Sequence, residues 1–110
     1  MCNLTDHVLL SETQKARMSR CKGCGQYTLV YKNVYLTFNE NEYQNFKTTL
    51  RGLKPADFNK DHPSGDLHVL LRNTKTHMGV SFSVKEVEEV LEIIREAELF
   101  EEVFSILYTK

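Results

Sequence analysis

Two cysteines separated by two residues are the clearest chemical feature of this sequence. They are Cys21 and Cys24, in the stretch SRCKGCGQYTLVY at residues 19–31. Thiolates at this spacing on a tight turn can bind one metal ion, and Gly25 can adopt the positive φ that such a turn needs. The same spacing also occurs in thiol–disulfide enzymes and in turns whose thiols are small buried hydrophobes. Three interpretations therefore stay open: a zinc knuckle, plain reduced thiols and a redox pair.

The residues after the second cysteine disfavour the redox interpretation. A redox Cys-x-x-Cys normally lies where a strand runs into a helix, because the helix N-terminus lowers the pKa of the first thiol. Here Cys24 is followed by GQYTLVY, which alternates as a strand does. We therefore expect the cysteine turn to join two antiparallel strands.

A zinc site at this turn needs ligands from elsewhere in the chain. A structural zinc ion takes four ligands, and the turn supplies two. Cys2 is the third candidate, because a strand that begins near residue 7 could bring it alongside the turn. The fourth would be one of the histidines His7, His62, His68 and His77. His7 is nearest to Cys2 in sequence, so the predicted zinc ligands are Cys2, His7, Cys21 and Cys24.

Strands are predicted on both sides of the turn. Residues 27–31 and 34–38 each alternate apolar and polar side chains, and Lys32-Asn33 separates them. A two-residue loop would pair Tyr31 with Val34 and Tyr27 with Phe38, which puts both apolar sets on the same face of a hairpin. This face should point into the core. Earlier strands are expected near residues 15–20 and 7–10.

The next segment predicts an amphipathic helix over residues 43–53. Asn39 can cap it, and Glu42, three residues later, completes a capping box. Gly52 and Pro55 should end it. Residues 54–66, which contain both prolines, form the one long loop.

The second half follows the same plan. Strands are predicted at 67–72 and 78–83, and Ser83 with Glu86 should cap a helix over residues 84–107. A shift of about 44 residues superimposes the two ββα units. The predicted fold is a single α+β domain over residues 1–110. It is a two-layer sandwich of a mainly antiparallel sheet and two helices, with a ββα–ββα plan preceded by one or two N-terminal strands.

Composition limits the function classes. No apolar run approaches the length of a membrane span, so no membrane location is expected. Three cysteines, an odd number, argue against a secreted disulfide framework and for reduced thiols in the cytoplasm. Residues 1–60 carry nine basic and five acidic side chains, whereas residues 61–110 carry five and ten. The simplest interpretation is that the two halves attract each other.

Other surface features suggest partners rather than catalysis. The tail ELFEEVFSILYTK is apolar over more than half of its circumference as a helix, so we expect either packing over the sheet or a homodimer through the C-terminal helix. The glutamates at 86, 88, 89, 92, 96 and 98 should form the solvated face of that helix. Weak nucleic-acid binding through Lys15, Arg17, Arg20 and Lys22 is a less favoured alternative.

Several of these stretches together resemble a known family. They are Met1-Cys2, RCKGCG at 20–25, YTLVYKNVYLTF at 27–38 and EYQNF at 42–46. They resemble a family of small uncharacterised bacterial proteins that share an initial Met-Cys, a Cys-x-x-Cys, two strands and an amphipathic helix. The resemblance covers residues 1–50 and implies a cytosolic bacterial domain. It gives the three cysteines weight as a set and supplies no substrate.

The sequence therefore predicts a small non-enzymatic binding or regulatory module of unknown biochemical function. Its cysteine turn has a structural role and is a candidate zinc knuckle, and its partner is an unidentified protein or a second copy. A thiol redox protein that uses Cys21 and Cys24 is the alternative.

Overall fold

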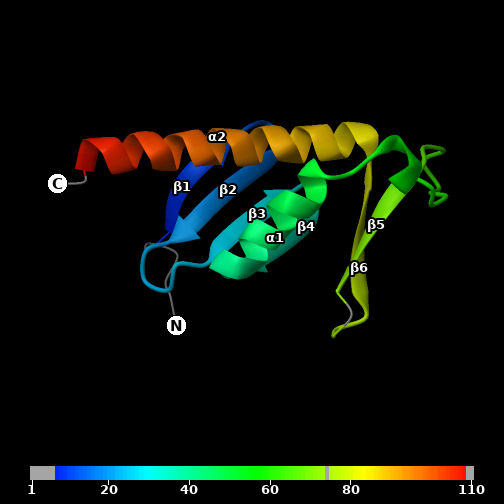
Figure 1. The fold of residues 1–110 in the computed structure, drawn as a ribbon, viewed down its shortest axis with the longest axis horizontal. Helices are drawn as coiled ribbons and strands as arrows, with labels where there is room; N and C mark the ends of the chain where they lie inside the picture. The colour runs from blue at the N-terminus through cyan, green and yellow to red at the C-terminus, as the bar shows by residue number, and fades with distance from the viewer. Residues whose placement is uncertain (1–6, 74, 109–110) are drawn as a thin grey trace.

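The computed structural model of the chain describes residues 7–73 and 75–108. Within them, six strands and two α-helices follow the order β1-β2-β3-β4-α1-β5-β6-α2 (Figure 1). Their bounds are β1 His7–Glu12, β2 Ala16–Cys21, β3 Tyr27–Tyr31, β4 Val34–Phe38, α1 Glu40–Arg51, β5 His68–Asn73, β6 Met78–Ser83 and α2 Val84–Tyr108. The α+β class and the ββα–ββα plan after two N-terminal strands are confirmed.

The first four strands form one antiparallel meander, in the order β1-β2-β3-β4. In β3 and β4, Tyr27 pairs with Phe38 and Tyr31 with Val34, which is the predicted register. Between β1 and β2 the register shifts after Leu9, so that two successive residues of β1 are buried. A β-bulge of this kind turns an extra side chain toward the core.

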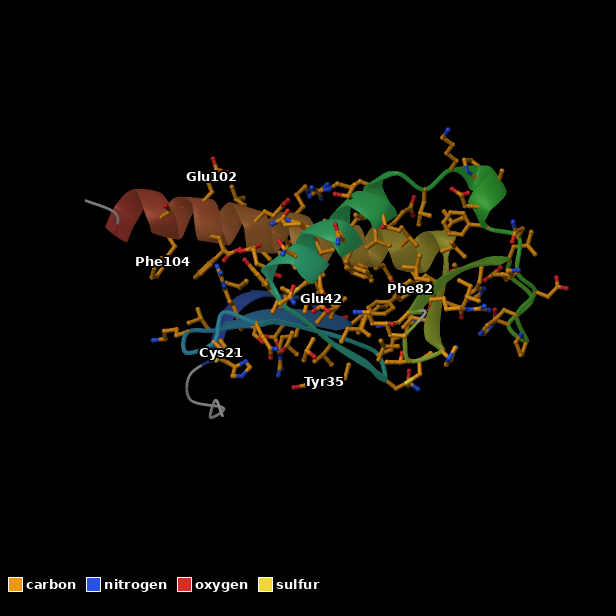
Figure 2. All side chains as sticks on the ribbon, turned by 60° about the horizontal axis from the view of Figure 1, so that its bottom comes forward. Cys21, Tyr35, Glu42, Phe82, Glu102 and Phe104 are labelled. Atoms are coloured by element: carbon orange, nitrogen blue, oxygen red, sulfur yellow. The ribbon has the colours of Figure 1, made fainter. Side chains whose placement is uncertain are left out.

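Both helices cover the same face of this sheet, as Figure 2 shows. Helix α2 lies across β1 and β2, and α1 lies beside it next to β4 (Figure 1). The core between the layers consists of fully buried apolar side chains from the strands and both helices: Met18, Leu29, Tyr31, Tyr43, Leu50, Val90, Ile93, Ile94 and Ala97. The predicted inward orientation of Tyr27 and Tyr31 is therefore confirmed.

Each helix starts with the predicted capping box. The Asn39 side chain accepts from the Glu42 amide at 2.8 Å, and the Ser83 hydroxyl accepts from the Glu86 amide at 3.2 Å. Because the caps fix the first turn, α1 begins at Glu40 and not at residue 43 as predicted. It ends at Arg51, before residue 53, while α2 runs one residue past the predicted end at 107.

The second hairpin does not extend the first sheet. Strands β5 and β6 form a separate two-stranded sheet at the far end of the molecule from the cysteine turn (Figure 1). Strand β5 begins one residue later than predicted, and Leu67 remains 53% exposed. Phe82 is buried and meets Tyr31 edge-on, with ring centroids 6.1 Å apart. The hairpin therefore extends the core beneath the start of α2 without adding a strand to the meander.

The glutamates of α2 are not all on a solvated face, so that prediction is wrong in part. Glu88, Glu92 and Glu96 are exposed as expected. Glu86, Glu89 and Glu98 instead form ion pairs with cations of the first half of the chain. These pairs are Lys32–Glu86 at 2.7 Å, Lys15–Glu89 at 2.9 Å, and Lys47–Glu98 at 2.8 Å.

Tyrosine hydroxyls of the sheet also meet carboxylates of α2. Tyr31 donates to Glu89, and the Tyr27 hydroxyl lies 3.3 Å from both oxygens of Glu101. Arg20 pairs with the same Glu101 at 3.0 Å. Burial and the nearby Glu101 charge raise the pKa of Tyr27 to about 12. The opposite charges of the two halves of the sequence are therefore used to hold α2 on the sheet.

No helix in residues 7–73 and 75–108 is long and apolar enough to cross a membrane.

The buried Lys47 should make Glu98 the costliest of these carboxylates to remove. The side chain of Lys47 is only 8% exposed, so Glu98→Ala leaves an ammonium group buried without its carboxylate. We expect a loss of about 2 kcal/mol in the free energy of unfolding by urea, since Glu98 itself is partly solvated. The exposed Glu92→Ala on the same helix should change it by less than about 0.5 kcal/mol. Adding Lys47→Met to Glu98→Ala should recover most of the loss, and a failure to recover would contradict this account.

The same carboxylates predict acid sensitivity. Burial would raise the pKa of Glu98, but hydrogen bonds from Lys47 and Arg51 outweigh it and lower the pKa, and bonds from Tyr31 and Lys15 lower that of Glu89. The folded-state pKa of both groups lies below the unfolded value of about 4.3. These pairs therefore contribute their full stabilisation of the folded state above about pH 4.3. Their contribution is lost as the pH falls through the folded values.

The contribution of these two groups to the urea midpoint should therefore stay nearly constant between about pH 7 and pH 5. Below about pH 4.5 the midpoint should decrease. The double variant Glu89→Gln/Glu98→Gln should be less stable at neutral pH and lose less on acidification. Equal acid losses in the two proteins would show that other groups control the transition.

Candidate functional site

The cysteine turn connects β2 to β3 and is held by its own backbone. The Cys21 amide donates to the Gln26 carbonyl at 2.9 Å, and the Gly25 amide donates to the Cys21 carbonyl at 2.8 Å. Gly25 has a φ of +77°, which favours glycine. After Cys24 the chain enters strand β3 and not a helix. This agrees with the prediction from the sequence.

The two thiols have different environments. Cys21, the last residue of β2, is 1% exposed, whereas Cys24 lies exposed on the turn. The backbone amide of Cys24 donates to the Sγ atom of Cys21 at 3.5 Å. A hydrogen bond of this kind stabilises charge on the sulfur, whereas the burial of Cys21 acts against it.

His7 is the histidine that the fold brings to this turn. It pairs with Cys21 across β1 and β2. Residues paired in this way project to the same face of a sheet, with Cβ atoms about 5 Å apart. Cys21 and its neighbour Arg20 also line a groove that the end of β2 shares with the C-terminal end of α2.

The other histidines lie elsewhere. His68 is buried in β5, where its Nδ1 lies 3.0 Å from the Asp66 carbonyl, and His62 stacks on it with ring centroids 3.9 Å apart. His77 is in the turn between β5 and β6. This hairpin lies at the opposite end of the molecule from the cysteine turn (Figure 1). Of the four candidate histidines, the structure leaves His7 as the one near the thiols.

The described residues do not by themselves complete a metal centre. Within residues 7–73 and 75–108, no three His, Cys, Asp or Glu side chains are grouped closely enough to hold an ion. Cys2, the remaining predicted ligand, lies outside the described residues. The observed part of the predicted site is therefore the turn, its amide–sulfur contact and the pairing of His7 with Cys21.

The basic residues proposed for nucleic-acid binding are mostly engaged within the chain. Lys15 pairs with Glu89, Arg17 with Glu12 at 2.6 Å, and Arg20 with both Glu101 and Glu40. Paired carboxylates cancel much of the positive potential that attracts phosphates. The charge asymmetry of the two halves indicated an attraction but not its partners, because five of the seven Lys/Arg–Glu pairs among the described residues join positions far apart in the chain.

Comparison with curated proteins and with solved structures gives no match to this chain. A family model, described as a family of unknown function (DUF6686), matches residues 1–109. The match extends the likeness noted for residues 1–50 to both ββα units. The chain therefore belongs to this family of unknown function.

Proposed function

We propose that the protein is a small, non-enzymatic, cytoplasmic binding module in which the cysteine turn holds a structural zinc ion. The ligands are Cys2, His7, Cys21 and Cys24. One observation carries the proposal: the Cys24 amide points at the Cys21 sulfur in the β2–β3 turn, and the neighbouring strand β1 pairs His7 with Cys21. A zinc ion bound there would catalyse no reaction. It would cross-link the chain segments that carry its ligands.

The chemistry of the turn suits zinc better than catalysis. Zinc binds thiolates and neutral imidazoles, and the amide contact favours the thiolate of Cys21. A redox thiol is usually activated by the positive end of a helix. The helix end that shares a groove with this turn is the C-terminal end of α2, which is negative. This electrostatic setting disfavours the redox alternative.

The position of the site explains what zinc would contribute. Strand β1 is at the edge of the meander, and His7 is its first residue. Edge strands fray easily because one side of their backbone is unpaired. A zinc ion shared by β1 and the β2–β3 turn would hold that edge closed. Apparent binding energies of structural zinc are on the order of 10 kcal/mol, comparable to the stability of a whole domain.

The proposed cytoplasmic location follows from the thiols. An odd number of cysteines, one of them exposed on a turn, suits a reducing compartment.

Native mass spectrometry and metal analysis test the zinc site directly. We expect one zinc ion per chain and a lower Tm after treatment with a chelator. Cys24→Ser should lose the metal, whereas His77→Ala, in the distant hairpin, should retain it. A metal-free wild type, with thiols that remain reduced and a Tm unaffected by chelator, would leave the cysteines as plain thiols. A thiol that titrates well below the ordinary pKa of about 8.5 in that protein would support the redox alternative.

His7 can be tested separately from the thiols. His7→Ala should weaken zinc binding by at least about 100-fold in a competition titration with a chelator, since a ligand is lost. His7→Cys should retain tight binding, because a thiolate can replace the imidazole. Unchanged affinity in His7→Ala would assign the fourth position to a different ligand.

A further inference from the structure

The outer face of α2 changes character along its length. Glu88 and Glu92 lie on the exposed side of the helix. Eleven residues is close to three helical turns, so residues 99 and 103 lie on the same face further along. They are Leu99 and Val103. This face of α2 is therefore charged where the helix covers the sheet and apolar where the helix extends past the sheet.

This apolar stripe is largely uncovered. Leu99 is 60% exposed, Val103 46% and Phe104 50%, and Phe100 is also exposed. With about 200 Å² for each aromatic residue, these four side chains expose roughly 350 Å² of contiguous surface. Patches of this size on a soluble protein commonly mark interaction sites.

The stripe borders a groove of about 500 Å³ between α2 and the strand ends. Apolar Val8 and Leu10 line it from β1, and Phe100 and Phe104 line it from α2. Figure 2 shows Phe104 on the side of α2 toward the strand end with Cys21, and Glu102 on the opposite side. Lys22 lies at the rim of the groove.

We propose that a second copy of this chain covers the groove and the stripe, with the two α2 ends packed antiparallel about a two-fold axis. A two-fold interface uses the same patch on both copies, so the patch must complement itself. This patch has both parts: a convex stripe at Leu99 and Val103 and the groove beside it.

The area and the charges fit a dimer. A standard interface buries about 800 Å² per partner, of which about 60% is apolar. The four exposed side chains alone supply most of that apolar area. Charges of both signs line the groove, with Arg20 and Lys22 beside Glu101. Two copies can therefore meet without a net repulsive rim. This proposal does not depend on the zinc site.

Sedimentation or light scattering of the full chain tests the dimer. From about 5 to about 200 µM, the wild type should shift from monomer toward dimer mass. Leu99→Lys/Val103→Lys should weaken dimerisation by at least about 100-fold, because it puts four lysines into the apolar contact. The milder Leu99→Ser/Val103→Ser should weaken it to a smaller extent, and far-UV circular dichroism should show both variants folded.

The matched control moves the same replacements three turns back. Glu88→Lys/Glu92→Lys places lysines on the same face over the sheet and should leave dimerisation within about threefold of the wild type. A wild type that stays monomeric over this range overturns the proposal and assigns the stripe to a different protein. A dimer that persists in both Leu99/Val103 variants overturns it by placing the interface elsewhere.

Discussion

The fold depends on the way in which α2 lies across both halves of the chain. It packs on β1 and β2, touches α1, and continues from β6, so it is the element that joins the meander to the second hairpin. Its buried side chains Val90, Ile93, Ile94 and Ala97 are completely removed from solvent. Because β5 and β6 form their own sheet, they share a core with the meander through this helix and the rings of Phe82 and Tyr31.

Apolar burial and ion pairs have different roles in this arrangement. Burying a valine or isoleucine contributes about 1.5–3 kcal/mol, whereas a partly exposed ion pair contributes about 0–1 kcal/mol. The pairs of Lys15, Lys32 and Arg20 with α2 are therefore minor terms in stability. They act on specificity instead, because Glu86, Glu89 and Glu101 reach their cations only while this side of α2 faces the sheet. The Lys47–Glu98 pair differs because its cation is buried.

Local patterns predicted much of this structure, and long-range pairings account for what they missed. The register of β3 and β4 and both capping boxes depend on residues within about ten positions of each other, so alternation and spacing reveal them. Glu88 and Glu89 have identical side chains, and only the packed position of α2 distinguishes a solvated glutamate from one bonded to Tyr31. The division into two sheets likewise depends on where a distant hairpin packs. At the candidate site the turn was predictable, whereas the pairing of His7 with Cys21 depends on the register of β1 against β2.

The cysteine turn and the end of α2 are physically continuous, which links the two proposals. Cys21, Lys22 and Gly25 line the same groove as Phe100 and Phe104. A ligand that orders the turn therefore also fixes one wall of the groove, and a second copy that fills the groove restrains the turn. Such coupling is reciprocal: if zinc strengthens dimerisation by some factor, dimerisation strengthens zinc binding by the same factor. The carboxylate of Glu101 lies at the junction, because it holds Arg20 and Tyr27 of the strands and belongs to the helix that carries the stripe. The far end of α2 and the N-terminal edge of the sheet are therefore one continuous region of the structure.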